Sequence, residues 1–422
     1  MTPSTRGGLE LADVIRTYLP DYLAVYGATT SAQRMRVLRA IASCRTAALG
    51  GHKRRCDHCG HEEIAYNSCR NRHCPKCQAA ARADWLESRS AELLPVPYYH
   101  VVFTLPEVIG SIALQNKRVL YNMLFQAASK TLLRIAADPG HLGAQIGFLA
   151  VLHTWGQNLM HHPHLHCVVP GGGLSPDRSQ WVPCKDGFFL PVRVLSKVFR
   201  GKFLALLRRA YRSGKLQFQG QLSGLRQPKA FERLISAAVR NDWIVYARPP
   251  FGGPQQVLKY LARYTHRVAI SNSRLISMAD GKVTFGWKDY AEGNRKKTMT
   301  LSAAEFLRRF LMHVLPSGFM RIRHFGFLAN RSRRTKLDLC RQHLGVTNPS
   351  NDRPCENRED RPQAPTECND SADGPRHHAR CPACKSGRLV TVEVIPRVMR
   401  HACFPITWGT PLPIMATGWD TS

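Results

Sequence analysis

One short segment near the N-terminus most limits what this chain can fold into, because it is crowded with metal-binding side chains. Residues 52–77 (HKRRCDHCGHEEIAYNSCRNRHCPKC) contain five cysteines and four histidines. The segment is too short and too polar to fold around an apolar core of its own. A segment of this kind is folded by a bound metal ion, and little holds it together without the ion.

Two Cys-x2-Cys pairs define the expected metal site. Cys56 pairs with Cys59 and Cys74 pairs with Cys77, with 14 residues between the two pairs. Each such turn can place two sulfurs about 2.3 Å from one tetrahedral zinc ion. The spacing therefore predicts one structural Zn²⁺ held by these four thiolates. Four nearby side chains stay open as replacement ligands or as ligands of a second ion: His58, His61, Cys69 and His73.

The charge of the chain indicates what it binds. Its 422 residues include 60 Lys+Arg against 29 Asp+Glu, a formal net charge of +31. So basic a surface attracts polyanions, and nucleic acid is the commonest one inside cells. No apolar stretch is long enough to cross a bilayer, and the N-terminus lacks a secretory pattern. We therefore expect a soluble, cytoplasmic DNA-binding protein without a membrane partner, whose 14 cysteines bind metal rather than form disulfides.

The rest of the chain divides into parts of different composition. The N-terminal region has helical spacing up to Gly50-Gly51, and from Tyr98 onward β-branched strands alternate with segments of helical spacing. An α+β protein is therefore expected. The expected parts are an N-terminal helical segment (1–50), a zinc-binding, DNA-contacting domain (51–97), a larger catalytic domain (98–345), and a low-complexity linker and tail (346–422).

The tail carries half of a second metal site. Between Thr347 and Arg388 there is no Val, Ile, Leu, Met, Phe, Tyr or Trp, so these 42 residues are predicted to be largely a disordered linker. They include Cys381-Pro-Ala-Cys384, and the strand-like sequence LVTVEVIP follows. A tetrahedral site needs two further ligands, which Cys368, Cys403 or another chain would have to supply. Otherwise the pair is an unpaired remnant.

A different group of metal-binding side chains lies in a predicted strand. In the sequence HLH, His164 and His166 alternate along the strand, so both imidazoles share one face and suit a divalent ion. If the chain folds back as a hairpin with Trp155 opposite His164, then His153 lies opposite His166 and faces the same side. His153 is therefore the predicted third ligand, with Gln157 as the alternative.

Two tyrosines form the partner motif. Tyr260 and Tyr264 lie on a segment that Pro254 can start as a helix, so both phenols fall on one face about one turn apart. Arg263 and Arg267 flank that face and can hold phosphates. A metal that polarises a phosphate, together with a phenolate that attacks it, would cleave DNA through a phosphotyrosine intermediate.

In this order the motifs resemble a known family. The zinc segment, HTWGQNLMHHPHLHCVVPGGG, YLARYTHR and EFLRRFLMHVLPSGFMRIRHFGFLA are similar to the two-tyrosine HUH transposases of rolling-circle insertion sequences, the insertion sequence ninety-one group. The similarity covers most of residues 10–345. It implies a nuclease core of the RRM-like or ferredoxin-like kind, an antiparallel sheet with helices on one side.

The resemblance also implies an activity. This is nicking and joining of single-stranded DNA at the element ends, through a 5′-phosphotyrosine and a free 3′-hydroxyl. The histidines of the HxH motif would hold Mg²⁺ or Mn²⁺, in a bacterial protein associated with the nucleoid. No G-x-x-x-x-G-K-[ST] motif occurs in the sequence, so unwinding would have to come from a host helicase. The oligomeric state stays open.

Arginines near each motif are the predicted DNA contacts. Residues 263–346 alone carry 17 Lys+Arg against 5 Asp+Glu. The predicted phosphate contacts are Arg54, Arg55, Arg70, Arg72, Arg263, Arg267, Arg321, Arg323, Arg331, Arg333 and Arg334. Two alternative functions stay open: a plasmid replication initiator or relaxase with the same chemistry, and a non-catalytic, zinc-containing DNA-binding repressor.

Overall fold

The computed structural model describes residues 8–90, 92–240, 242–248, 268–289, 292–293, 295–346 and 380–398, without the side chains of 83–90. These residues form two compact units. The first unit contains residues 8–42 and the described part of 70–346, and the second contains residues 43–69 and 380–398. In the described part of the chain, no helix is long and apolar enough to cross a membrane.

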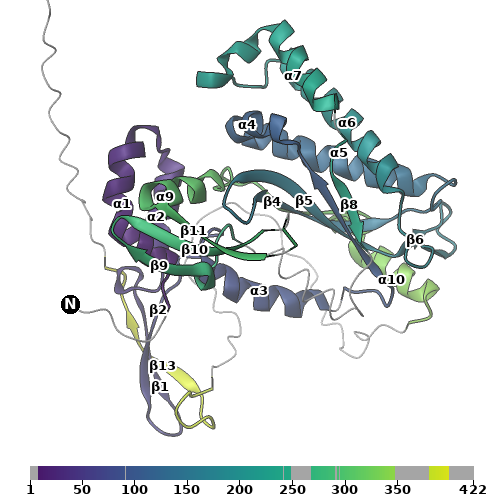
Figure 1. The fold of residues 1–422 in the computed structure, drawn as a ribbon. Coiled ribbons are helices and arrows are strands. Elements are labelled where there is room, and N and C mark those ends of the chain that lie inside the picture. The colour runs from purple at the N-terminus through teal and green to yellow at the C-terminus, as the bar shows by residue number, and fades with distance from the viewer. Residues whose placement is uncertain are drawn as a thin grey trace, which may run out of the picture. The chain divides into compact units, whose positions relative to one another are not determined.

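A five-stranded antiparallel sheet is the centre of the first unit (Figure 1). Its strand order is β12-β4-β5-β3-β8, and every neighbouring pair is antiparallel. The strands are β3 (Tyr98–Thr104), β4 (Gly147–Trp155), β5 (His161–Pro170), β8 (Val245–Arg248) and β12 (Ile322–Gly326).

Helices cover one face of this sheet, as Figure 1 shows for α4, α5 and α6. The helices that contribute to this core are α4 (Glu107–Gln115), α5 (Lys117–Ala137), α6 (Val192–Arg212) and α7 (Pro228–Arg240). Because side chains alternate along a strand, Val101 and Phe103 of β3 and Leu165 and Cys167 of β5 point into this core and are fully buried. The intervening residues point to the opposite face, where His164 and His166 of β5 lie.

A second sheet and the N-terminal helices complete much of the first unit. Its strands are β9 (Leu275–Ala279), β10 (Lys282–Asp289) and β11 (Arg295–Ser302), in the order β11-β10-β9. Helix α1 (Leu11–Tyr26) packs against α2 (Ala32–Ala42) and α9 (Ala303–Met312). The turn at Asp280-Gly281 has positive φ at both residues, which suits a tight β9–β10 hairpin.

The remaining described helices and turns, with a two-stranded sheet, belong to one or other of the two units. They are α3 (Pro75–Ser90), α10 (Arg333–His343), the strand pair β6 (Gly172–Leu174) and β7 (Trp181–Pro183), and the 3₁₀ turns Gly27–Thr29, Ala47–Leu49, Gly220–Arg226, Asn272–Arg274 and Asn330–Ser332.

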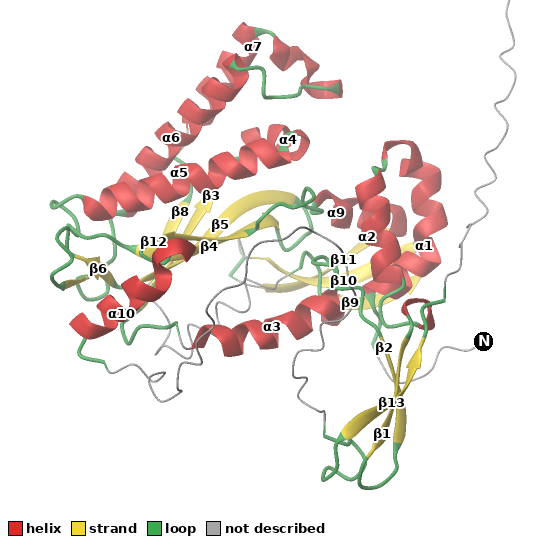
Figure 2. Cartoon of the chain, turned by 180° about the vertical axis from the view of Figure 1, so that it is seen from behind, coloured by secondary structure: helices red, strands yellow, loops and turns green. Residues whose placement is uncertain are grey.

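The second unit is built from the two ends of the chain. Its strands are β1 (Gly51–Cys56), β2 (Glu62–Tyr66) and β13 (Leu389–Ile395), visible together as yellow arrows in Figure 2. Strand β1 lies in the middle and pairs antiparallel with both others. LVTVEVIP therefore forms a strand as predicted, but the strand belongs to the same sheet as the N-terminal cysteine segment.

The predicted α+β class is confirmed. The sheet is antiparallel, and α4–α7 pack against one of its faces. The predicted linker lies mostly outside the described residues.

Candidate catalytic and zinc-binding sites

Three histidines converge on the face of the central sheet opposite the helical core. The candidate ligand atoms of His153, His164 and His166 all lie within 4.8 Å of one another. The hairpin register differs from the expected one: His153 pairs with His164, and Trp155 pairs with His161. The pairing shifts by one further residue between His153 and Trp155, where β5 contains one more residue than β4. His153 nevertheless keeps its predicted face, because the two-residue change from the expected pairing preserves the alternation of side chains.

Hydrogen bonds orient two of these imidazoles. His164 Nδ1 lies 2.7 Å from the carbonyl oxygen of His162, to which it donates, so its Nε2 carries the lone pair. His166 Nδ1 lies 2.8 Å from Nε2 of His100. Burial lowers the pKa of His100 to about 4, so that ring is neutral and its Nε2 can accept the proton of His166. Both HxH histidines thus have the arrangement typical of metal ligands, with the second ring nitrogen hydrogen-bonded.

His100 is a functional candidate that sequence reasoning missed. It lies on β3, next to β5 in the sheet but 66 positions earlier in the chain. Its signal in the sequence is a polar residue inside the otherwise apolar strand YYHVVFT. Gln157, the alternative third metal ligand, lies in the turn between β4 and β5. Its backbone carbonyl accepts a hydrogen bond from Arg274.

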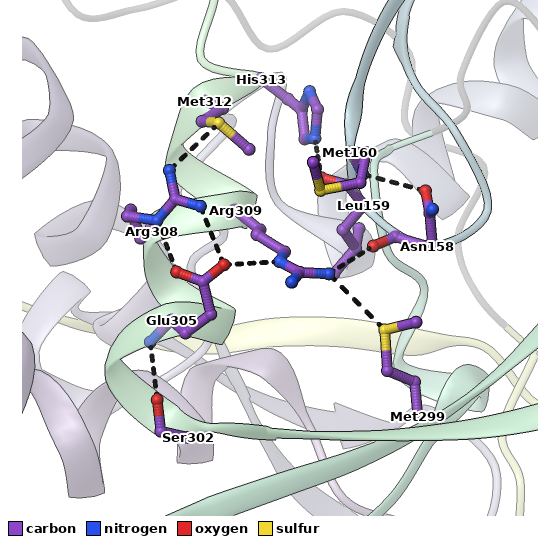
Figure 3. A network of polar contacts seen from close by, with 10 residues as sticks. All are labelled: Asn158, Leu159, Met160, Met299, Ser302, Glu305, Arg308, Arg309, Met312 and His313. Atoms are coloured by element: carbon purple, nitrogen blue, oxygen red, sulfur yellow. Dashed lines mark hydrogen bonds and ion pairs between the residues drawn. The ribbon is translucent and has the colours of Figure 1, made fainter.

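Helix α9 carries a charged network around Glu305 (Figure 3). Arg308 donates two hydrogen bonds to the Glu305 carboxylate, and Arg309 donates a third. The Arg308 hydrogen bond is the main reason that the pKa of Glu305 falls to about 2. The carboxylate therefore stays ionised at neutral pH and fixes both guanidinium groups.

The same helix holds the turn between β4 and β5 (Figure 3). Nη1 of Arg309 donates to the carbonyl of Asn158 at 3.3 Å. His313, just after α9, is buried and hydrogen-bonds through Nε2 to the carbonyl of Leu159 at 3.0 Å. Its Nδ1 lies 3.2 Å from the hydroxyl of Thr154 on β4. These contacts fix the hairpin that brings the three histidines together.

We expect His313→Ala to lower the free energy of unfolding by about 2–4 kcal/mol, because it removes both hydrogen bonds and leaves a cavity. Chemical denaturation measures this change. The matched control is His141→Ala, at an exposed histidine, with an expected change within about 0.5 kcal/mol. Equal stability of the two variants would contradict the role given to His313.

The tyrosine motif cannot be placed. Tyr260, Tyr264, Arg263 and Arg267 all lie outside the described residues. Their assignment remains a prediction from the sequence.

The structure groups the cysteines of the expected zinc site differently from the sequence prediction, which chose Cys56, Cys59, Cys74 and Cys77. Cys56 and Cys59 lie with Cys381 and Cys384 in the second unit, with all four sulfurs within 4.8 Å of one another. The sequence could not indicate this grouping, because a Cys-x2-Cys turn has the same local spacing whichever second pair lies beside it. The pairing of β1 with β13 decides the combination, and it joins residues more than 300 positions apart.

Four further cysteines in the N-terminal part of the chain lie away from the Cys56–Cys59 turn in sequence: Cys44, Cys69, Cys74 and Cys77. Cys74 directly precedes α3 and Cys77 lies in its first turn, both buried in the first unit. Cys44 and Cys69 lie side by side in the second unit, where the Cys69 N–H donates to Cys44 Sγ at 3.5 Å. Sequence reasoning missed Cys44 because it stands alone in a region of helical spacing.

Several predicted DNA-contacting arginines are engaged within the protein. On β1, Arg54 and Arg55 form ion pairs with Glu63 and Glu62 of β2. In the first unit, Nη1 of Arg72 donates to the carbonyl of Phe319 at 2.5 Å. Such arginines form contacts within the folded protein in addition to supplying positive charge.

The arginines after residue 320 fall into two groups. Arg321 donates to Gln78 Oε1 at 2.6 Å, and burial lowers its pKa to about 10. The Arg323 guanidinium lies 4.1 Å from the ring centroid of Phe125, and Arg333 forms an ion pair with Glu92. By contrast, Arg331 and Arg334 are exposed, as is Arg70 earlier in the chain.

Comparison with known families defines the class of protein. Residues 14–105 match the family described as "Transposase zinc-binding domain", and residues 147–336 match the family described as "Putative transposase". The second match contains β4, β5 and the three converging histidines. The chain is therefore a transposase, a DNA-processing enzyme with an N-terminal zinc-binding domain.

Two relatives cover most of the chain. It is 57% identical over 407 residues to "Putative transposase y4qJ" of Sinorhizobium fredii, covering 96% of this chain and 99% of that protein. It is 30% identical over 309 residues to "Transposase for insertion sequence element IS801" of Pseudomonas savastanoi pv. phaseolicola, covering 72% and 70%. The chain belongs to the insertion sequence ninety-one group of transposases. No solved structure matches it.

Proposed function

We propose that this transposase nicks and rejoins single-stranded DNA at the ends of an insertion sequence, by metal-assisted attack of a tyrosine. The observation that carries the proposal is the convergence of His153, His164 and His166 on the face of the sheet opposite the helical core. Three imidazoles, two of them oriented by hydrogen bonds, can provide three ligands of a divalent ion. The remaining coordination positions of the ion are then available for phosphate oxygens.

The histidines would bind the ion through nitrogen. His164 and His166 offer Nε2, since their Nδ1 atoms face His162 O and His100. Imidazole donors favour Mn²⁺ over Mg²⁺, so we expect cleavage with either ion and at a lower concentration of Mn²⁺. When bound, the ion would polarise the scissile phosphate.

The tyrosines would carry the covalent step. The phenolate oxygen of Tyr260 or Tyr264 forms a bond to phosphorus, and the bond from phosphorus to the 3′ oxygen breaks. The leaving 3′ oxygen takes up a proton, so the products are a 5′-phosphotyrosine and a free 3′-hydroxyl. Reversal of this step with a 3′-hydroxyl from another strand rejoins DNA.

Exposed arginines would supply part of the DNA affinity. We expect Arg331→Ala together with Arg334→Ala to weaken binding to all single strands similarly, and to reduce the slope of log K against log salt by about 1.4. Titrations at several salt concentrations measure this slope. Arg321→Ala is a poor probe, because it also removes a hydrogen bond to Gln78. An unchanged slope would exclude Arg331 and Arg334 as phosphate contacts.

The zinc-binding domain has enough further cysteines for its own ion. The matched residues 14–105 include six cysteines, of which Cys56 and Cys59 lie with the C-terminal pair. Four others remain, which is the number that a tetrahedral structural zinc ion requires.

A cleavage assay tests the proposed function. Labelled single-stranded oligonucleotides tiling both ends of the encoding element are incubated with the protein and Mn²⁺. We expect nicking of one strand at a fixed site near an end, blocked by EDTA. Binding without nicking under all conditions would favour a repressor. Nicking only at a plasmid origin would favour a replication initiator or relaxase.

A further inference from the structure

Two turns from opposite ends of the chain meet in the second unit. The first, Cys56 to Cys59, follows β1, and the second, Cys381 to Cys384, precedes β13. Their four sulfurs lie within 4.8 Å of one another. Cys56 Sγ lies 3.7 Å from Cys384 Sγ, and Cys59 Sγ lies 3.7 Å from Cys381 Sγ.

These distances fit a tetrahedral ion better than disulfide bonds. Four sulfurs about 2.3 Å from one zinc ion are separated by about 3.8 Å along each edge of the tetrahedron. A disulfide would bring two sulfurs to about 2.05 Å, and all four cysteines are free thiols. The arrangement therefore leaves room for one ion at the centre of the four sulfurs.

The two turns have the same backbone design. The Gly60 N–H donates to the carbonyl of Cys56 at 3.2 Å, and the Lys385 N–H donates to the carbonyl of Cys381 at 2.9 Å. Gly60 has a φ of 72°, and Lys385 has a φ of 58°. A non-glycine residue in this left-handed region is uncommon, so the second turn is held in its form by the structure around it.

Backbone amides also point at the sulfurs. The N–H groups of His58 and Cys59 lie 3.4 and 3.5 Å from Cys56 Sγ. The N–H of Gly387 lies 3.3 Å from Cys384 Sγ. Hydrogen bonds of this kind stabilise a negatively charged thiolate, which is the form that binds a metal ion.

Direct contacts lock one turn to the other. The Arg388 N–H donates to Asp57 Oδ1 at 2.7 Å, and the Asp57 N–H donates to the Arg388 carbonyl at 3.0 Å. At Gly387, an added Cβ atom would lie 2.4 Å from Cys56 Sγ and 2.7 Å from Asp57 Oδ1. The turns therefore approach as closely as a glycine permits.

We propose that Cys56, Cys59, Cys381 and Cys384 bind one Zn²⁺ ion and close a zinc ribbon made of β1, β2 and β13. Two of these ligands lie in the C-terminal part of the chain, beyond residues 14–105 and 147–336 that match the transposase families. Cys59 and Cys381 are 322 positions apart, so the ion ties the C-terminal part of the chain to the N-terminal zinc-binding region. Chelation of this ion would release β13 from β1.

Zinc content of full-length variants tests the shared site. The Cys56→Ser, Cys59→Ser pair, the Cys381→Ser, Cys384→Ser pair and the fourfold variant should each lose the same one equivalent of zinc per chain. The two alternative ligands outside the described residues provide the control: Cys368→Ser and Cys403→Ser should lose none. Losses from the two pairs that add to two equivalents, or no loss from the C-terminal pair, would overturn the proposal.

A glycine variant tests the site without removing a ligand. Gly387→Ala should lower zinc affinity at least tenfold in a chelator competition, because its methyl group collides with Cys56 Sγ. Gly224→Ala, where an added Cβ meets nothing within 4 Å, should leave the affinity unchanged. Equal affinity of the two variants would contradict the close approach.

A mixing experiment tests whether the site forms within one chain. The two pair variants are mixed, and zinc and molecular mass are measured by native mass spectrometry. For a site within one chain, we expect no recovery of zinc and no new dimer. Recovery of one equivalent in a dimer would show a site between chains and would overturn the proposed tether.

Discussion

His166→Ala is expected to lose DNA cleavage by at least about 10³-fold while it keeps near-normal affinity for single-stranded DNA. The loss follows if His166 holds the ion that stabilises charge at the phosphate, since about 4 kcal/mol of such stabilisation corresponds to this factor. Affinity survives because it comes mostly from dispersed contacts to phosphates. His164→Ala should behave in the same way, in single-turnover cleavage and binding assays done side by side.

Two comparisons make this test specific. His141→Ala, at an exposed histidine, should cleave normally. His153→Ala should lose most activity, whereas Gln157→Ala should retain most of it, because His153 is the residue whose ligand atom lies with the HxH pair. The opposite result would move the third ligand to Gln157. Full activity of His166→Ala, or of the native protein in EDTA, would end the metal proposal.

The double variant Tyr260→Phe, Tyr264→Phe is expected to form no covalent DNA adduct at all. Phenylalanine keeps the ring but has no oxygen to attack phosphorus, so the proposed intermediate cannot form. At least one single variant should still nick DNA yet fail to complete transposition, since one phenol would hold one strand while the other cuts. Denaturing gels and a transposition assay in cells measure the two effects.

The controls for the tyrosines separate chemistry from folding. Tyr18→Phe, in helix α1, should form the adduct at the native level. The double variant should also bind DNA and melt like the native protein. If it nicked DNA with little loss of rate, water would be the nucleophile and strand transfer through phosphotyrosine would be excluded.

The central sheet and the HxH histidines could be predicted because their signals are local. Alternation along β5 places His164 and His166 on one face whatever the neighbouring strands do. The pairing register could not be predicted, since a hairpin with a two-residue shift leaves the same side chains on the same face. His100 was missed for a related reason: its contact with His166 arises from the pairing of β3 with β5, which the sequence of either strand alone does not specify.

The cysteines show the same limit more strongly. Each Cys-x2-Cys turn predicts two ligands, but nothing in its spacing says which second pair completes the tetrahedron. Proximity along the chain favoured Cys74 and Cys77 for Cys56 and Cys59. The structure instead uses the pairing of β1 with β13, a contact between distant parts of the sequence.

Net charge indicates DNA binding for the whole molecule, but it does not identify which arginines are available to contact DNA. Arg54 and Arg55 were selected for their position next to cysteines, yet each faces a glutamate across the β1–β2 pair. Arg323 lies against the ring of Phe125. A count of charges does not distinguish these paired or stacked side chains from exposed ones such as Arg331.

The most direct test of the account is to locate the covalent bond between protein and DNA. The native protein is incubated with single-stranded oligonucleotides from the element ends and Mn²⁺, digested, and analysed by mass spectrometry. We predict a nucleotide 5′-phosphate attached to the peptide that contains Tyr260 and Tyr264, formed only with the metal and absent in EDTA. An adduct on any other residue, or efficient nicking with no adduct, would contradict the proposed mechanism.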